Sequence, residues 1–287
     1  MIAIVFACVS LLGWGIGDIF TTSASRKIGS YNSSFYGYFF GCLLTTFYIP
    51  FALSTWKDFS LSMILLTSFL AVIQLLAFFA FNEGLKIGNA SLVGTIAGAF
   101  TSVVVILSIL FLGESVSSSQ AVSIAIIFVG LILSSINLSD LKNKKSLVNK
   151  GTVYALLAMV GWAIYFTFIK IPVQKSGFFW PSYTTGIVGS LIFLLFGLRR
   201  IKMPKSDIRS GFPAIFVSST LLTIGSFSFN FAICRGLSSV VAPIAGAYPA
   251  LFALLAFLIF KDPITKQQKL GMVTTLLGII LLALFSR

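Results

Sequence analysis

The sequence predicts an all-α integral membrane protein of ten transmembrane helices, arranged as two inverted repeats of five helices each. Composition is the first indication: of 287 residues, 57% are hydrophobic and 9% are charged, with a mean hydropathy of +1.03, whereas about a quarter of a soluble domain is charged. The second is a series of apolar runs that are each long enough to cross a bilayer. The third is a second half that repeats the first.

Each predicted span holds about 20 mostly apolar residues, the length that a helix needs to cross the hydrocarbon core. Glycine and proline residues, which interrupt helices, separate neighbouring runs. Ser117 with Gln120, and Thr265 with Gln268, have the spacing of a capping box, which predicts a helix start at each pair. The predicted helices cover residues 2–24, 32–54, 60–82, 89–112, 118–137, 151–172, 179–198, 211–233, 238–260 and 267–285.

The internal repeat has a constant offset of 148 residues. Gly13-Trp14 returns as Gly161-Trp162, and the segment from Ile96 to Phe100 returns as Ile244 to Tyr248. Because each half has an odd number of helices, the second half enters the membrane upside down relative to the first, an arrangement found in many secondary transporters. We divide the chain into a first repeat at 1–139, a Lys-rich linker at 140–150 and a second repeat at 151–287.

Both halves resemble the EamA-like domain of the drug/metabolite transporter superfamily, over nearly the whole chain. The motifs that carry the resemblance are the Gly-Trp pair of helices one and six, the glycine- and alanine-rich start of helices four and nine, and an acidic residue after those helices. These acids are Glu114, which follows Gly113 and precedes Ser117 and Gln120, and Asp262, which precedes Thr265, Gln268 and Gly271. Pro249 matches a proline of the family pattern, whereas its counterpart Thr101 and the residue Lys261 depart from it. The resemblance implies a transporter fold and leaves the substrate open.

Basic residues predict the orientation. With ten spans, one face of the membrane carries all but five of the 20 lysine and arginine residues. An excess of basic residues marks the cytoplasmic face, so both termini are predicted to be extracytoplasmic. The resemblance to the EamA type implies cytoplasmic termini instead, and we follow the charge. The five residues on the other face are Lys57, Lys170, Lys175, Arg235 and Arg287.

Two acidic residues lie in a predicted span or at its end; inside the membrane a charge costs about 3 kcal/mol on insertion scales. Asp18 in helix one and Glu83 at the end of helix three have Phe166 and Phe231 as repeat counterparts, so neither belongs to the shared scaffold. Each is a candidate site for a proton or a cation. The alternative is a carboxylate held at the membrane rim by a neighbouring base: Arg26, Lys27 or Lys86.

Other polar residues in the spans have two interpretations each. Asn82 and Asn230 are repeat counterparts, and such amides either bind substrate or bond between helices. Lys170, at the end of helix six, is expected to extend its amine outward to water.

Helices four and nine are the predicted gating core. Helix four has a small-residue pattern at Gly94 and Gly98 that permits close helix approach, and helix nine has prolines that favour a bend. Aromatic residues of helices one, four, six and nine are candidates for the walls of a solute cavity. The full set of predicted cavity residues is Trp14, Asp18, Asn82, Glu83, Thr95, Gly98, Phe100, Trp162, Tyr165, Asn230, Pro243, Gly246, Tyr248 and Pro249.

The function predicted from these observations is transport of small organic metabolites or drugs by alternating access, in a multi-pass protein of the cell membrane. Sugar uptake is the alternative within transport, with Thr95, Thr101, Ser102 and Asn82 as candidate partners for sugar hydroxyls. A lipid flippase, a receptor and an intramembrane enzyme are the competing classes. The chain has no histidine and no metal-ligand spacing, so we expect no catalysis, no catalytic or metal-binding residue and no cofactor. The expected partners are the solute, the lipid bilayer and a coupling proton; the basic residues lie in short loops, which argues against nucleic acid.

Overall fold

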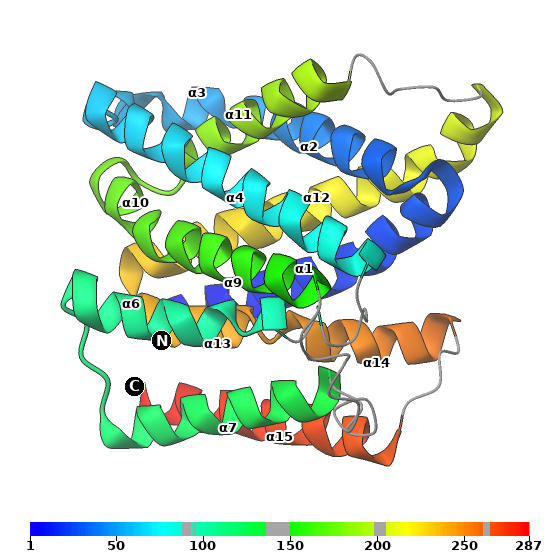
Figure 1. The fold of residues 1–287 in the computed structure, drawn as a ribbon. Coiled ribbons are helices and arrows are strands. Elements are labelled where there is room, and N and C mark those ends of the chain that lie inside the picture. Colours follow the sequence, from blue (N-terminus) through cyan, green and yellow to red (C-terminus); the bar gives the residue numbers. More distant parts are fainter. Residues whose placement is uncertain (88–92, 94–95, 136–149, 198–204, 261–264, 287) are drawn as a thin grey trace.

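The fold is a bundle of helices packed in layers (Figure 1). The computed structural model describes all residues except 88–92, 94–95, 136–149, 198–204, 261–264 and 287. The helices are α1 Ile2–Ile28, α2 Ser30–Thr46, α3 Ile49–Ala52, the short 3-10 helix η1 Leu53–Asp58, α4 Leu61–Ile87, α6 Phe100–Leu112, α7 Ser118–Ser135, α9 Lys150–Phe168, α10 Lys170–Ser176, α11 Phe179–Gly197, α12 Lys205–Arg235, α13 Ser238–Ala245, α14 Tyr248–Phe260 and α15 Lys266–Phe285.

Several of these helices have the length and composition of membrane spans. Among the described residues, six helices qualify alone and a seventh span forms if Tyr31–Thr46 and Ile49–Asp58 are taken together. Three shorter apolar helices, Ile96–Leu112, Ser118–Ser134 and Phe179–Leu195, add to them. The chain is therefore an all-α, multi-pass membrane protein.

Counterpart helices of the two halves run in opposite directions (Figure 1). The tightest packing follows the same symmetry: α1 packs against α12, their counterparts α9 and α4 pack against each other, and α7 packs against α15. Close contacts at glycine make these pairs possible. A side-chain carbon on Gly13 would lie 2.9 Å from Cα of Gly225, and one on Gly161 would lie 2.8 Å from Cβ of Ala77. Position 225 is the counterpart of position 77, so one contact occurs twice in the bundle.

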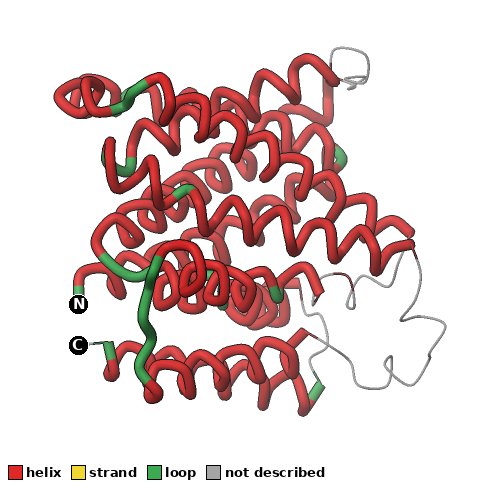
Figure 2. The backbone as a smooth tube through the Cα atoms, turned by 60° about the vertical axis from the view of Figure 1, so that its left-hand side comes forward, coloured by secondary structure: helices red, strands yellow, loops and turns green. Residues whose placement is uncertain are grey.

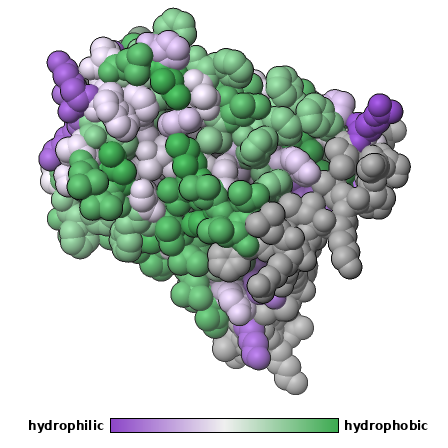
Figure 3. Space-filling model, turned by 90° about the horizontal axis from the view of Figure 1, so that it is seen from above, coloured by the Kyte–Doolittle hydropathy of each residue, from purple (hydrophilic) through white to green (hydrophobic). Residues whose placement is uncertain are grey.

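Both chain termini lie at one end of the bundle (Figures 1 and 2). Seen from above, hydrophobic side chains cover the middle of the molecule and hydrophilic ones gather at its two ends (Figure 3). Large apolar residues of α4 are strongly exposed, for example Leu65 at 61% and Phe69 at 63%. Such a surface requires lipid contact.

The second predicted helix, 32–54, is not continuous, which corrects the sequence prediction. The chain bends by 60° between Thr46 and Ile49. Pro50 lies in the first turn of α3 and has no N–H to donate to the carbonyl of Thr46, so the helix cannot run on. The indole Nε1 of Trp180 donates to the carbonyl oxygen of Ala52 at 3.1 Å, which fixes the bent segment against α11.

The predicted helix starts are confirmed at both capping boxes. Gln120 N donates to Ser117 Oγ at 3.3 Å, and Ser117 N donates to Gln120 Oε1 at 2.9 Å. Thr265 and Gln268 make the same reciprocal pair before α15. These two boxes begin α7 and α15, the helices that pack against each other at one side of the bundle (Figure 1).

Candidate functional site

Two adjoining cavities lie between the two halves of the bundle. The larger has a volume of about 300 Å³ and is lined by residues of α1, α2, α4, α9, α11 and α12. The smaller has a volume of about 200 Å³ and reaches α6 and α14. The cavities form one connected site because they share lining residues, namely Trp14, Tyr38, Gln74, Phe78, Phe166 and Leu222.

The aromatic wall of this site is built twice by the repeat. The ring of Trp14 lies 5.5 Å from that of Phe229 and 5.8 Å from that of Tyr248. The counterpart ring, Trp162, lies 5.2 Å from Phe81 and 5.9 Å from Phe100. Adding 148 to a first-half number and subtracting 148 from a second-half number turns one set of contacts into the other, so the inverted repeat places two matching aromatic clusters around the cavities.

Asp18 and Phe166 occupy the same repeat position and break this symmetry. The Phe166 ring joins the two clusters, at 5.7 Å from Trp14 and 5.1 Å from Phe100. Asp18 lines the smaller cavity beside Trp162 and Tyr248. The first repeat therefore adds a carboxyl group where the second adds a ring.

Two pairs of polar side chains that line the larger cavity are bonded to each other. Asn230 donates from Nδ2 to Ser182 Oγ at 2.6 Å, which joins α12 to α11. Tyr165 donates its hydroxyl to Thr185 Oγ1 at 3.4 Å, which joins α9 to α11. Asn230 thus makes a hydrogen bond between helices, which is one of the two roles predicted for it, and it also lines the cavity.

The structure brings some of the predicted site residues together and leaves others apart. Thr95 lies outside the described residues. Those that line neither cavity are Asn82, Glu83, Gly98, Pro243, Gly246 and Pro249. Asn82 donates from Nδ2 to the Phe78 carbonyl of its own helix at 2.9 Å. Those that line a cavity are Trp14, Asp18, Phe100, Trp162, Tyr165, Asn230 and Tyr248.

Sequence reasoning missed the contribution of α2. This helix lines the larger cavity with Gly37, Tyr38, Gly41, Cys42 and Thr45. Gly37 and Gly41 are four residues apart, the same small-residue spacing that singled out helix four, so this signal was available in the sequence.

Lys170 corrects a further prediction. Its side chain does not extend to water but is 7% exposed, with Nζ 2.6 Å from Oε1 of Glu114. A buried ammonium is tolerated when it meets a carboxylate and further hydrogen-bond acceptors.

Among the described residues, no group of His, Cys, Asp and Glu is arranged to hold a metal ion.

Comparisons with known proteins agree with this fold. One relative, the uncharacterized protein MJ1333.1 of Methanocaldococcus jannaschii, is 31% identical over 137 residues, which are 48% of this chain and 98% of that protein. A crystal structure of another protein superposes with a TM-score of 0.78 at 14% identity, covering 99% of this chain and 97% of the other, and shows the fold alone.

The family is given by two matches of one sequence profile, at residues 1–136 and again at residues 149–284. The two matched segments hold the two halves that pack around the aromatic cavities, and they agree with the Gly-Trp and acidic motifs of the sequence. The chain belongs to the EamA-like transporter family.

Proposed function

We propose that the protein is a secondary transporter that carries small organic molecules across the cell membrane by alternating access, without covalent chemistry. The observation that carries this proposal is the aromatic site enclosed between two halves of opposite direction. Two similar folds of opposite orientation can exchange conformations, so that a central site faces one side and then the other. Its larger cavity has the volume of the smallest ligand pockets, which begin at about 300 Å³.

The proposed topology has ten spans. The six long helices, the bent pair and the three shorter apolar helices fall on the ten predicted segments in order. Ten spans give each half five helices, which is what reverses the direction of the second half. The Lys-rich face is proposed to be cytoplasmic, with both termini on the opposite side.

The lining favours an organic solute with an aromatic or apolar body. Rings of both repeats supply the walls, and Asp18 is the carboxylate among the described lining residues. A neutral or cationic solute suits such a site better than an anion, because ring faces and a carboxylate both attract positive charge. Sugar uptake fits less well, since two pairs of hydroxyl and amide groups of the larger cavity already bond each other.

The test is a ligand screen on the purified protein, followed by uptake into sealed vesicles. We expect aromatic or cationic compounds from a panel that includes sugars and amino acids to raise the melting temperature and to accumulate in proteoliposomes. Trp162→Ala should abolish both effects, because it removes one wall of the site. Phe69→Ala is the matched control, as this ring is 63% exposed on α4 and should leave both effects intact. Lipid scrambling without uptake of any compound would support a flippase instead.

A further inference from the structure

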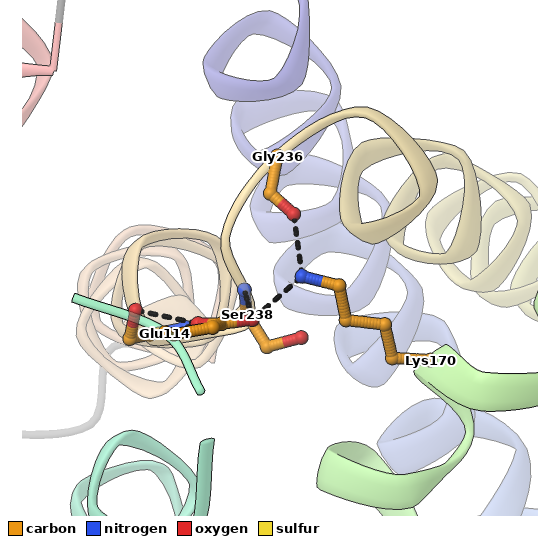
Figure 4. A network of polar contacts seen from close by, with 5 residues as sticks. Glu114, Lys170, Gly236 and Ser238 are labelled. Atoms are coloured by element: carbon orange, nitrogen blue, oxygen red, sulfur yellow. Dashed lines mark hydrogen bonds and ion pairs between the residues drawn. The ribbon is translucent and has the colours of Figure 1, made fainter. Parts of the chain in front are cut away.

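Lys170 begins α10 after a break in the sixth span, and α10 lies at the end of the bundle that bears both termini (Figure 1). α9 ends at Phe168 and α10 begins at Lys170. Pro172 has no N–H to donate to the Phe168 carbonyl, which explains the break. The amine at Nζ reaches two acceptors from here: Oε1 of Glu114 at 2.6 Å and the Gly236 carbonyl at 2.9 Å (Figure 4).

Glu114 meets Lys170 from the other half of the chain. It follows Gly113, which ends α6 in the left-handed conformation, with φ of 66°, and turns the chain toward α7. Its carboxylate accepts from Lys170 and from three groups at the start of α13: the amide of Ser238 at 2.8 Å, the amide of Ser239 at 2.8 Å and the hydroxyl of Ser239 at 2.6 Å.

The carboxylate therefore replaces a local helix cap. Leu237, the residue before α13, makes no side-chain cap bond. Glu114 instead accepts hydrogen bonds from the backbone amides that have no partner inside the helix. A negative charge at this position is also favoured by the helix dipole. Burial by itself opposes ionisation of Glu114, but the hydrogen bonds from Lys170, Ser239 and Ser238 outweigh it and lower the pKa of the carboxyl.

One ion pair thus joins three parts of the protein at one end: the α6–α7 connection of the first half, the break between α9 and α10, and the α12–α13 turn. The repeat offers no copy of this cation at the other end. The counterpart of Lys170 is Thr22, whose hydroxyl donates to the Asp18 carbonyl of its own helix at 2.8 Å. The counterpart of Glu114 is Asp262, which lies outside the described residues. The lysine of this ion pair therefore belongs to the second repeat alone.

We propose that Glu114 and Lys170 form a latch that holds the terminus-bearing end of the transporter closed, and that the latch opens and re-forms in each transport cycle. The inference rests on the proposed function, since a latch of this kind has a role only if the two ends open in turn. Separating α6, α10 and α13 exposes both charges to water, and their hydration offsets part of the free energy that is lost with the ion pair. The latch accordingly has a closed, dry state and an open, hydrated state.

Cys234 supplies a native reporter beside the latch. It lies on α12 two residues before Gly236, is half-buried, and its Sγ is 3.7 Å from the Val173 carbonyl of α10. In a Cys8→Ser, Cys42→Ser background, the rate of its reaction with a maleimide measures how often α10 and α12 separate. The measurement uses purified full-length protein and no solute, so it stands whether or not uptake is found.

The variants compare removal of the latch with removal of charge elsewhere. Glu114→Gln and Lys170→Met should each raise the labelling rate at least about tenfold, and Lys175→Met, which removes an exposed amine of the same helix, should not. The double variant Glu114→Gln, Lys170→Met leaves no unpaired buried charge, so its melting temperature should recover toward that of the parent. Its labelling should nevertheless stay at least about tenfold faster, because the bond that closes the end is gone.

Two results would overturn the latch. Parent-like labelling in both single variants would show that the pair does not hold α10 against α12. Fast labelling in the single variants that returns to the parent rate in the double variant would show that the pair only stabilises the fold. If the latch variants behave as expected but no compound is carried across vesicles, the proposed function fails and the conformational device remains.

Discussion

Asp18 is the residue on which we expect coupling to a pH gradient to depend. It lines the smaller cavity, on the position that carries Phe166 in the other repeat. A carboxyl that binds and releases a proton during the cycle can couple solute movement to a pH gradient. We expect Asp18→Asn to abolish uptake driven by a pH gradient while preserving solute binding and downhill exchange, because asparagine keeps the shape and loses the exchangeable proton.

Glu83→Gln is the control for this prediction. Glu83 lies near the end of α4 and is not among the residues that line the two cavities. Its variant should keep gradient-driven uptake. Unchanged gradient-driven uptake in both variants would remove proton coupling from the mechanism and leave facilitated diffusion.

At the residue scale, the sequence predicted the walls of the cavity better than the ion pair. Trp14 and Trp162 could be found because the repeat marks them, and their environments match in the structure. Lys170 could not be placed, because a lysine at a helix end commonly reaches water along its flexible stem. Its partner Glu114 is 56 positions away in the chain, and only the packing of three helices brings the two together.

At the scale of elements, the ninth span shows how a glycine sets a helix contact. α13 ends at Ala245 and α14 begins at Tyr248, so regular helix is interrupted at Gly246 within the single span from Ser238 to Ile259. A side-chain carbon at Gly246 would overlap the Cγ2 methyl group of Thr101 on α6 and lie 2.8 Å from the Ala242 carbonyl. The close approach of helices four and nine therefore depends on this glycine.

Substitution of Gly246 should impair transport by forcing these helices apart. We expect Gly246→Leu to abolish uptake, and Gly246→Ala to reduce uptake and to destabilise the protein by about 1–3 kcal/mol, the usual cost of overpacking. Thr101→Ser removes the overlapping methyl group and keeps the hydroxyl, so it should restore part of the loss caused by Gly246→Ala. Measuring the uptake and the melting temperature of the single and double variants checks both the loss and its partial restoration. Normal uptake by Gly246→Leu would show that the two helices do not need to meet here.

The bends were harder to predict than the spans. Apolar length gave the order of the helices, because the cost of lipid-exposed backbone requires each run to be helical. The same measure could not show the 60° bend after Thr46, since the residues on both sides of it are equally apolar. Pro50 was visible as a helix breaker, but a proline near the end of a run either stops a helix or begins a new one, and the contact with Trp180 decides between these outcomes.

At the scale of the whole molecule, the repeat is the organising feature. One relative matches 48% of this chain over 98% of its own length, so a similar chain of about half this length exists. In this chain the two halves are joined, so each half can have a different residue at a matching position of the repeat. Asp18 opposite Phe166, and Lys170 opposite Thr22, are such differences, and they lie at the cavity and at one end of the bundle.

The orientation of the whole molecule follows from where the basic loops lie, and it determines which side the latch closes. With ten predicted spans, the loops rich in lysine and arginine fall on the face of the membrane opposite both termini. Since such loops are retained in the cytoplasm, we expect a reporter fused after Arg287 to read extracytoplasmic. A reporter inserted in the linker at 140–150 should read cytoplasmic, because five predicted spans separate it from each terminus. The reverse result at both sites would invert the orientation and place the latch on the cytoplasmic side. The same reading at both sites would contradict an odd number of spans in each half, and with it the inverted repeat on which alternating access depends.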